Sequence, residues 1–195
     1  MAHKGLLLLD VDGPLNPYAA KPNLRPPGYE TFRRTRGGGW FGGRDARRHK
    51  GLRVWLRPDH GALLRALAED AELQLVWATT WLEEANTLIG PAIGLPELPV
   101  IHYPPADLER DGDGHRWRTG GAWKWSGVAA YAEGRPLAWL DDDHADPRFA
   151  RARAAFEHER RSSPTLLCHV DPATGLQDGH LDQIRTWAAT LPAGR

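Results

Sequence analysis

Residues 6–13 read Leu-Leu-Leu-Leu-Asp-Val-Asp-Gly, an apolar run of strand length that ends in two aspartates and a glycine. A short apolar run closed by a turn residue is typical of a strand buried on both faces of a parallel sheet. Active sites of open α/β sheets lie at the carboxyl ends of such strands. Because side chains alternate along an extended chain, Asp10 and Asp12 should point the same way and repel each other unless a cation or a reaction uses them. A strand followed by an ordinary Asx turn explains the same residues.

The composition predicts one soluble domain. The chain has 195 residues and a formal net charge of +0, so its overall charge gives no argument for nucleic-acid binding. Its one cysteine, Cys168, excludes an intramolecular disulfide and favours a reducing, cytoplasmic location. The apolar run at 6–9 is too short for a signal peptide or a membrane span. We therefore expect a single cytoplasmic domain over residues 1–195 that does not contact a membrane.

The rest of the chain alternates predicted strands with predicted helices. Apolar runs predict four strands after the first one, at residues 73–78, 99–102, 136–140 and 165–170. Apolar spacing predicts helices at residues 59–69, 82–89, 123–131, 145–159 and 178–191. This alternation indicates an α/β, Rossmann-like fold with a central parallel sheet of about five strands and helices on both faces.

Residues 14–57 break the alternation, because they contain many prolines and glycines and no convincing helix. Between Arg25 and Arg57 there are nine arginines and one lysine against only two acidic residues. Strands at 29–34 and 52–57, joined by a long basic loop, would make a small β-hairpin flap inserted after the first strand. Arginines bind phosphates and aromatic rings stack on bases, so the flap's candidate substrate-binding residues are Trp40, Arg44 and Arg47. A loop of solvated arginines is the alternative.

Two further groups of polar residues lie beside predicted strands. The strand at 73–78 is followed by Thr79, Thr80 and Trp81. Their hydroxyl and backbone N–H groups could bind a phosphoryl oxygen, although a threonine here could equally cap the next helix and Trp81 could simply pack. Lys124 lies between two tryptophans just before a buried strand, where it is either a fixed positive charge or an ordinary surface lysine.

A run of aspartates follows the strand at 136–140. Asp141, Asp142 and Asp143 are consecutive, and Asp146 comes shortly after them. A helix N-cap needs only one such residue, and the remaining charges would repel one another without a cation.

The order Asp-x-Asp, Thr, Lys, Asp-Asp resembles the haloacid dehalogenase (HAD) superfamily of phosphohydrolases. The stretches LDVDGPLNP, VWATTWLEEAN, RPLAWLDDD and VDPATGL are similar to the HAD domain of Swiss Army Knife RNA-repair proteins and related stand-alone bacterial proteins. The resemblance covers the whole chain. Pro14 stands where the family commonly has Thr or Val, which would stiffen the turn without altering a named role.

The resemblance implies a magnesium-dependent phosphohydrolase with an aspartyl-phosphate intermediate. Asp10 would be the nucleophile, and Asp12 would be the general acid and base. Mg²⁺ would bind a carboxylate oxygen of Asp10, the backbone carbonyl of Asp12, and Asp142.

The resemblance also implies roles for the remaining groups. Thr79 would bond a phosphoryl oxygen, and Lys124 would neutralise charge on the phosphoryl group and on Asp10. Either Asp141 or Asp146 would accompany Asp142 at the metal, and Asp143 would cap the next helix.

Specificity in this superfamily lies in the inserted cap, and a small basic cap favours a nucleotide or a polynucleotide end as substrate. Thr80 and Trp81 are further candidates for substrate contact, and the flap is a candidate for RNA contact. Phosphorylated small molecules are also possible substrates.

Two alternative functions are a catalytically idle module that binds RNA through the flap and a signalling receiver domain. The receiver order differs, because receivers place the acidic pair first and the lysine last.

Overall fold

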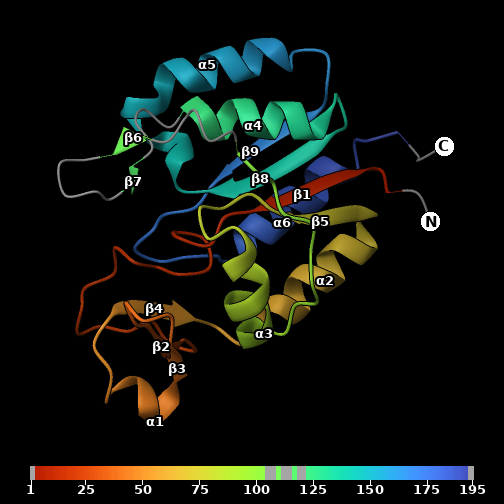
Figure 1. The fold of residues 1–195 in the computed structure, drawn as a ribbon. Coiled ribbons are helices and arrows are strands. Elements are labelled where there is room, and N and C mark those ends of the chain that lie inside the picture. Colours follow the sequence, from red (N-terminus) through yellow and green to blue (C-terminus); the bar gives the residue numbers. More distant parts are fainter. Residues whose placement is uncertain (1–2, 104–108, 111–115, 118–121, 193–195) are drawn as a thin grey trace.

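The computed structural model describes residues 3–103, 109–110, 116–117 and 122–192. Its centre is a four-stranded parallel sheet with the strand order β5-β1-β8-β9 (Figure 1). The strands are β1 (Gly5–Leu9), β5 (Leu73–Trp77), β8 (Leu137–Asp141) and β9 (Thr165–His169). The predicted α/β fold with a parallel sheet is confirmed.

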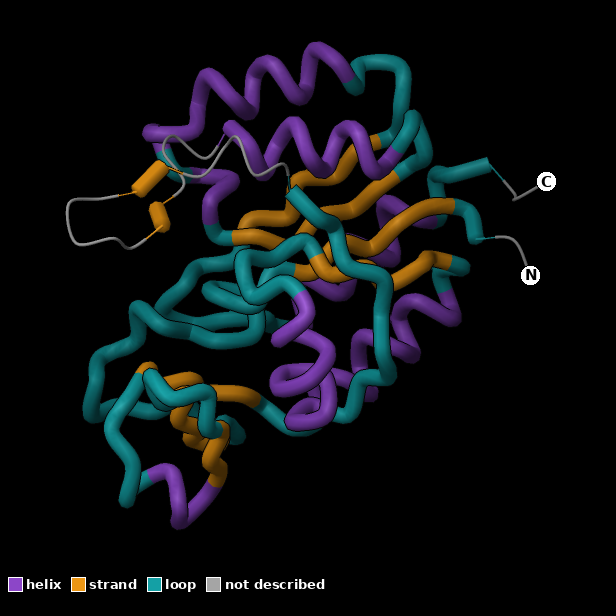
Figure 2. The backbone as a smooth tube through the Cα atoms, viewed as in Figure 1, coloured by secondary structure: helices purple, strands orange, loops and turns teal. Residues whose placement is uncertain are grey.

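Helices cover both faces of this sheet, as Figures 1 and 2 show. One face packs on α2 (His60–Asp70) and α6 (Asp178–Ala188), and the other packs on α4 (Ala122–Ala132) and α5 (Ala150–Glu159). The four leucines of β1 alternate between the two cores: Leu7 and Leu9 join the first, and Leu6 and Leu8 join the second. Burial on both sides explains why β1 is apolar at every position rather than at every other one.

The register of the sheet brings three strand ends to one edge. Leu9 lies opposite both Trp77 of β5 and Leu140 of β8. Asp10 and Asp141 come directly after Leu9 and Leu140, and Thr79 comes two residues after Trp77, so all three lie at the carboxyl edge of neighbouring strands, where ligand sites of open α/β sheets form.

A second, antiparallel sheet follows β1 and is called the cap sheet here. It contains β2 (Glu30–Arg34), β3 (Trp40–Gly42) and β4 (Leu52–Leu56) in the order β3-β2-β4. The strands at 29–34 and 52–57 pair as predicted, but the sequence did not predict β3 or the short helix α1 (Gly43–Ala46). Glycines on both sides of β3 do not favour a strand, so the composition did not indicate one there. In the structure, Trp40 and Phe41 of β3 pair with Arg34 and Arg33 of β2.

The fifth central strand, predicted at 99–102, is reduced to a single bridge between Trp77 and Val100. Pro99 lacks the N–H that a continuing ladder needs. In the described part of the chain, the central sheet therefore has four strands instead of about five.

Two predicted helices begin later than the sequence suggested. The helix at 82–89 begins at residue 83, because Leu82 has a φ of 47° and cannot be helical. It then runs through a π-helical turn, η1 (Ala85–Ile89), into α3 (Gly90–Ile93). The helix at 145–159 is interrupted by a proline, which forces extended backbone at the preceding Asp146. Two 3₁₀ turns, η3 (Asp143–Ala145) and η4 (Pro147–Phe149), therefore precede α5.

Two short strands, β6 (Glu109–Arg110) and β7 (Arg116–Trp117), pair with each other before α4. Among the described residues, no helix has the length and apolar character needed to cross a membrane.

The contact between α2 and α3 gives a stability prediction. A Cβ atom added to Gly61 would lie 2.1 Å from the backbone oxygen of Ile93, so we expect Gly61→Ala to lower the free energy of unfolding by about 1–3 kcal/mol. Gly179 is the matched control, because it is also the second residue of its helix and nothing lies within 4 Å of the added atom. Gly179→Ala should raise stability by about 0.5–1 kcal/mol. Urea unfolding measures both, and equal stability of the two variants would contradict the predicted clash.

Candidate active site

A buried lysine joins the carboxyl ends of two central strands. Lys124 of α4 has its Nζ 2.7 Å from Asp10 Oδ2 and 2.5 Å from Asp141 Oδ2. All three side chains are buried, with exposed fractions of 4%, 6% and 0%. Burial alone would lower the pKa of Lys124, but the two carboxylates hold that pKa well above its usual value, so the lysine stays charged.

Asp10 is held in one orientation. Its Oδ1 accepts a hydrogen bond of 2.7 Å from the backbone N–H of Val11, and its Oδ2 faces Lys124. Thr79 is buried beside Asp10, where its hydroxyl helps to lower the pKa of that carboxyl. Burial raises the pKa of Asp10 to about 6, against the opposing effect of Lys124. The aspartate, threonine and lysine predicted from three separate segments thus lie together.

Three carboxylates form an acidic cluster. Asp10, Asp141 and Asp142 each offer an oxygen atom, and these atoms lie within 4.8 Å of one another. Burial, together with the charges of Asp141 and Asp10, raises the pKa of Asp142 to about 7. Several closely spaced carboxylate oxygens are the donor set that hard divalent cations prefer. The residues of this cluster therefore fit a divalent metal ion.

Gly13 and Tyr18 complete the surroundings of Asp142, and the sequence did not identify either role. The hydroxyl of Tyr18 donates a hydrogen bond of 2.8 Å to Asp142 Oδ2. Gly13 has a φ of +91°, and a Cβ atom there would lie 2.5 Å from Asp142 Oδ1. Glycine is therefore required for the turn after β1 to approach the carboxylate. The position of Gly13 directly after the two aspartates is the one sequence signal that could have indicated its role, and no local pattern points to Tyr18.

Asp12 is bound through both carboxylate oxygens. Asn16 Nδ2 donates to Asp12 Oδ1 at 2.7 Å, and Trp81 Nε1 donates to Asp12 Oδ2 at 2.9 Å. Burial and the neighbouring charge of Asp10 raise the pKa of Asp12. Trp81 therefore contacts a predicted catalytic side chain directly, whereas its position in the sequence is compatible with either substrate contact or packing.

The structure separates Asp146 from the acidic cluster. The Asp146 carboxylate accepts a hydrogen bond of 2.8 Å from the backbone N–H of Arg148 and pairs with the Arg148 side chain. Asp146 thus caps the η4 turn. The prediction that Asp143 caps the next helix is therefore wrong. Asp143 instead donates its backbone N–H to Asp141 Oδ1 at 2.9 Å. Of the two aspartates, Asp141 is the one that lies in the acidic cluster with Asp142.

The predicted substrate-binding residues are divided between two places. Arg44 and Arg47 are exposed at α1, which lies on the side of the cap sheet away from the central sheet (Figure 1). The structure does not bring these two arginines to the carboxylates. Trp40 lies closer, because its ring meets the ring of Trp81 edge-on at 6.3 Å. Thr80 is exposed beside Trp81.

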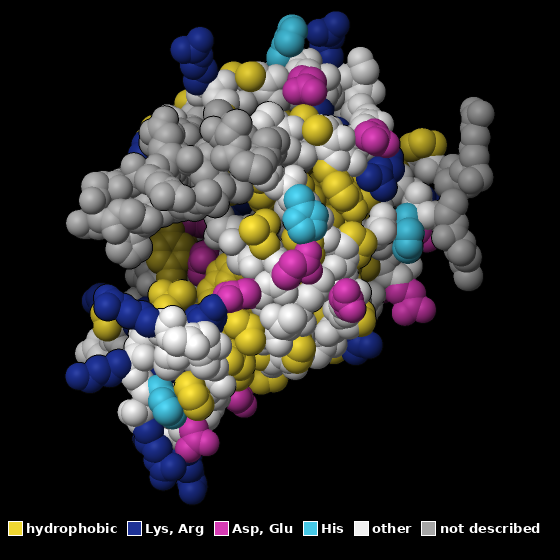
Figure 3. Space-filling model, viewed as in Figure 1, with side chains coloured by type: hydrophobic (Ala, Val, Ile, Leu, Met, Phe, Trp, Pro, Cys, Tyr) yellow, Lys and Arg dark blue, Asp and Glu magenta, His cyan; other side chains and the backbone are white. Residues whose placement is uncertain are grey.

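A pocket of about 730 Å³ opens beside Asp12. Its lining residues are Asp12, Arg34, Leu52, Thr80, Trp81, Leu82, Glu83, Glu84 and His102. A second pocket of about 760 Å³ shares Arg34 and Leu52 with it and adds Arg36 and Lys50. Figure 3 shows Lys and Arg side chains gathered at the lower left, where Figure 1 places the cap sheet and α1. The surface next to Asp12 therefore becomes basic toward the cap sheet.

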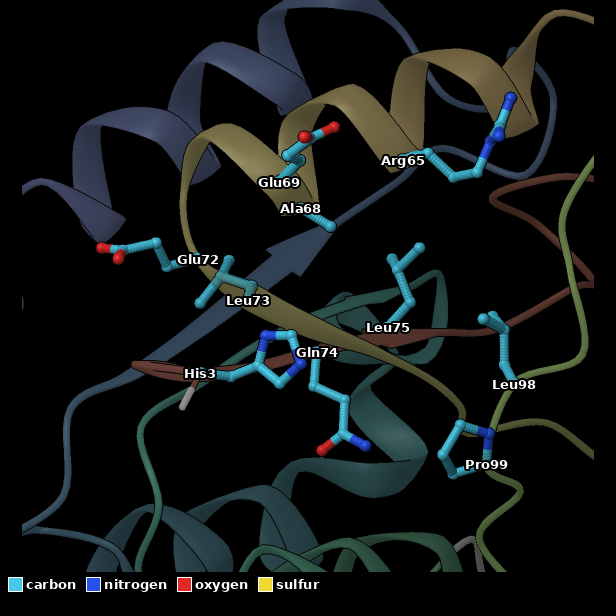
Figure 4. Close-up of a pocket in the computed structure, with 10 residues that line it drawn as sticks. All are labelled: His3, Arg65, Ala68, Glu69, Glu72, Leu73, Gln74, Leu75, Leu98 and Pro99. Carbon is cyan, nitrogen blue, oxygen red and sulfur yellow. The ribbon is translucent and has the colours of Figure 1, made fainter. Parts of the chain in front are cut away.

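A third pocket lies away from these residues. It has a volume of about 550 Å³ and lies between α2, the first half of β5 and Pro99 (Figure 4). None of the predicted site residues lines it. It is beside the start of β5, whereas the carboxylates lie at the strand ends.

Comparison with known proteins agrees with this geometry. A family model described as the HAD domain in Swiss Army Knife RNA repair proteins matches residues 6–181. No curated protein sequence matches the chain. The matched range extends from β1 into α6 and includes Asp10, Thr79, Lys124 and Asp142, so the resemblance found in the sequence is confirmed.

The acidic cluster gives a pH-dependent stability prediction. The pKa of Asp142 is about 7 in the folded protein and near 3.8 when unfolded, so the folded state binds its proton more tightly. Stability from this group is present below pH 3.8 and is lost as pH rises through 7. With a chelator present, we expect Asp142→Asn to match the wild type at pH 4 and to exceed its unfolding free energy by about 1–2 kcal/mol at pH 8.

Urea unfolding at a series of pH values measures this difference. Saturating Mg²⁺ should abolish the advantage of Asp142→Asn, because the cation compensates the carboxylate charge only in the wild type. Asp182→Asn is the control, because Asp182 is an exposed residue of α6 paired with Arg185. An advantage of Asp142→Asn that does not change with pH would contradict the prediction.

Proposed function

The chain belongs to the family of HAD domains found in Swiss Army Knife RNA repair proteins, and we propose that it hydrolyses phosphomonoesters with Mg²⁺ through an aspartyl-phosphate. One observation supports this proposal above the others. Lys124 lies between Asp10 and Asp141 at 2.7 and 2.5 Å, and Asp142 completes a carboxylate cluster beside them. A buried charge arrangement of this kind at strand ends costs stability and is typical of a reaction site.

Asp10 is the proposed nucleophile. Its carboxylate oxygen attacks phosphorus, a bond forms between Asp10 and phosphorus, and the bond to the ester oxygen breaks. Lys124 stabilises the negative charge that Asp10 and the phosphoryl group share, and Thr79 is placed to donate a hydrogen bond there. Water then attacks phosphorus and releases Asp10.

Asp12 is the proposed general acid and base. It gives a proton to the departing ester oxygen in the first step and takes one from the attacking water in the second. Its raised pKa favours carrying the proton that the first step needs. The hydrogen bonds from Asn16 and Trp81 leave the carboxylate fixed while the proton moves.

Mg²⁺ is the proposed metal, and Asp10, Asp142 and the backbone carbonyl of Asp12 would hold it. A bound divalent cation would reduce the repulsion between the Asp10 carboxylate and the phosphate dianion. Asp141 acts mainly on Lys124, because its Oδ2 faces that ammonium and its Oδ1 accepts the N–H of Asp143.

The proposed substrate is a nucleotide or a polynucleotide end. Three observations support it: the pocket beside Asp12 continues into a basic surface with Arg36 and Lys50, the ring of Trp81 lies at the pocket wall, and the family name refers to RNA repair. A catalytically idle module that binds RNA through the cap sheet is the second candidate. The basic surface would serve either function, but the buried lysine and acidic cluster favour the enzyme.

Loss of the nucleophile tests the enzyme. We expect the wild type to release phosphate with Mg²⁺ and to stop when the metal is chelated. Asp10→Asn should lower phosphate release at least about 10³-fold, because an amide cannot form the acyl phosphate. Asp182→Asn is the control for loss of a distant carboxylate. Tight RNA binding that Asp10→Asn leaves unchanged, with no turnover of any phosphomonoester by the wild type, would favour the idle module.

A substrate panel tests the proposed class. Initial rates with Mg²⁺ are compared for mononucleotides, 5′- and 3′-phosphorylated oligonucleotides, sugar phosphates and an aryl phosphate. We expect kcat/KM to be highest for nucleotides or oligonucleotides, and Arg36→Gln with Lys50→Gln to raise KM about 10-fold for oligonucleotides but not for the aryl phosphate. Equal or better activity on sugar phosphates would contradict the nucleic-acid substrate and leave the mechanism in place.

A further inference from the structure

Both oxygens of the proposed acid/base, Asp12, are bound by side chains that also contact the cap sheet. Asn16 donates to one oxygen at 2.7 Å, and Trp81 donates to the other at 2.9 Å. Neither donor belongs to the cap sheet itself: Asn16 follows the turn after β1, and Trp81 follows β5. The position of the Asp12 carboxylate therefore depends on two residues placed between the central sheet and the cap sheet.

Asn16 connects Asp12 to strand β4. Its Nδ2 binds Asp12, and its Oδ1 accepts a hydrogen bond of 3.0 Å from the backbone N–H of Trp55. Asn16 is only 1% exposed, so both bonds are sheltered from water. An amide side chain offers a donor and an acceptor at once, which is what this bridge between a carboxylate and a strand requires.

Trp81 connects Asp12 to strands β3 and β2. Its ring meets Trp40 of β3 edge-on at 6.3 Å, and Trp40 stacks on Phe32 of β2 at 5.1 Å and 11°. An ion pair lies beside these rings, between Arg34 of β2 and Glu84, with Nε 3.1 Å from Oε2. The indole that binds Asp12 is thus packed against the cap sheet.

We infer that Trp81 and Asn16 are positioning residues that place the Asp12 carboxylate for proton transfer only when the cap sheet is seated against the central sheet. This inference rests on the proposed function. It extends that function, because it makes the cap sheet a determinant of the proton-transfer step as well as a wall of the substrate pocket. Trp40 acts on Asp12 indirectly, because it contacts the ring of Trp81 and not Asp12 itself.

Leaving-group dependence distinguishes positioning from simple packing. The value of kcat/KM includes phosphoryl transfer to Asp10 but not the later hydrolysis of the intermediate. Departure of p-nitrophenolate needs no protonation, whereas departure of phenolate from unsubstituted phenyl phosphate does. A misplaced Asp12 therefore lowers kcat/KM more for phenyl phosphate than for p-nitrophenyl phosphate.

The test variants are Trp81→Phe, Asn16→Asp and Trp40→Leu. Trp81→Phe removes the indole N–H and keeps an aromatic ring, and Asn16→Asp keeps an oxygen for Trp55 but loses the donor to Asp12. Trp187→Phe is the matched control, because Trp187 is a half-buried residue of α6 that packs on the core away from Asp12. A series of ring-substituted phenyl phosphates then gives the slope of log kcat/KM against leaving-group pKa for each variant.

We expect Trp81→Phe and Asn16→Asp to lower kcat/KM about 10- to 100-fold for phenyl phosphate and about 3-fold or less for p-nitrophenyl phosphate. Trp40→Leu should steepen the slope in the same direction by a smaller amount, and Trp187→Phe should leave it unchanged. Equal losses for both substrates in Trp81→Phe and Asn16→Asp would mean that these residues only pack, which overturns the inference and leaves the phosphohydrolase intact. No turnover of any ester by the wild type would instead overturn the proposed function, and the inference with it.

Discussion

The contact on which the site depends is the buried ion pair of Lys124 with Asp10 and Asp141. A lysine that is 4% exposed is stable as a charged group only because two carboxylates face it at 2.7 and 2.5 Å. Those carboxylates come from β1 and β8, so α4 must lie over the carboxyl ends of these neighbouring strands for the pair to form. Loss of one partner of a buried pair costs about 3–5 kcal/mol, so the same contact that orients Asp10, the proposed nucleophile, also fixes the layers around it.

The central fold could be predicted because its signals are local. Four consecutive leucines indicate a strand covered on both faces, and each later strand is an apolar run followed by polar residues. The predicted elements that were wrong depend on backbone geometry, which composition does not indicate. Pro99 reduces a predicted strand to one bridge, Pro147 divides a predicted helix, and a glycine-rich segment contains β3. Each of these cases involves proline or glycine, and the effect of either residue depends on the backbone conformation and the strand pairing at its position.

The site was predictable as a set of residue types in order, but its supporting contacts were not. Asp10, Thr79 and Lys124 could be identified because each follows or flanks a strand. Tyr18 and Asp142 are separated by 124 positions, and Asn16 and Trp55 by 39, so no local pattern indicates that they meet. The prediction for Arg44 and Arg47 rests on their residue type and on the aromatic residues near them, and neither property indicates on which side of the cap sheet a residue lies. Trp81 was ambiguous because the same ring packs and donates a hydrogen bond.

The alternation of leucines along β1 has a consequence for how this chain tolerates change in length. Leu7 and Leu9 face one core while Leu6 and Leu8 face the other, and Asp10 continues the same two-residue period toward Lys124. Insertion or deletion of a single residue within β1 would exchange the two sets of leucines and turn the aspartate to the opposite side. The parity of this strand therefore sets the side toward which Asp10, the proposed nucleophile, points, and β1 can vary in sequence far more readily than in length.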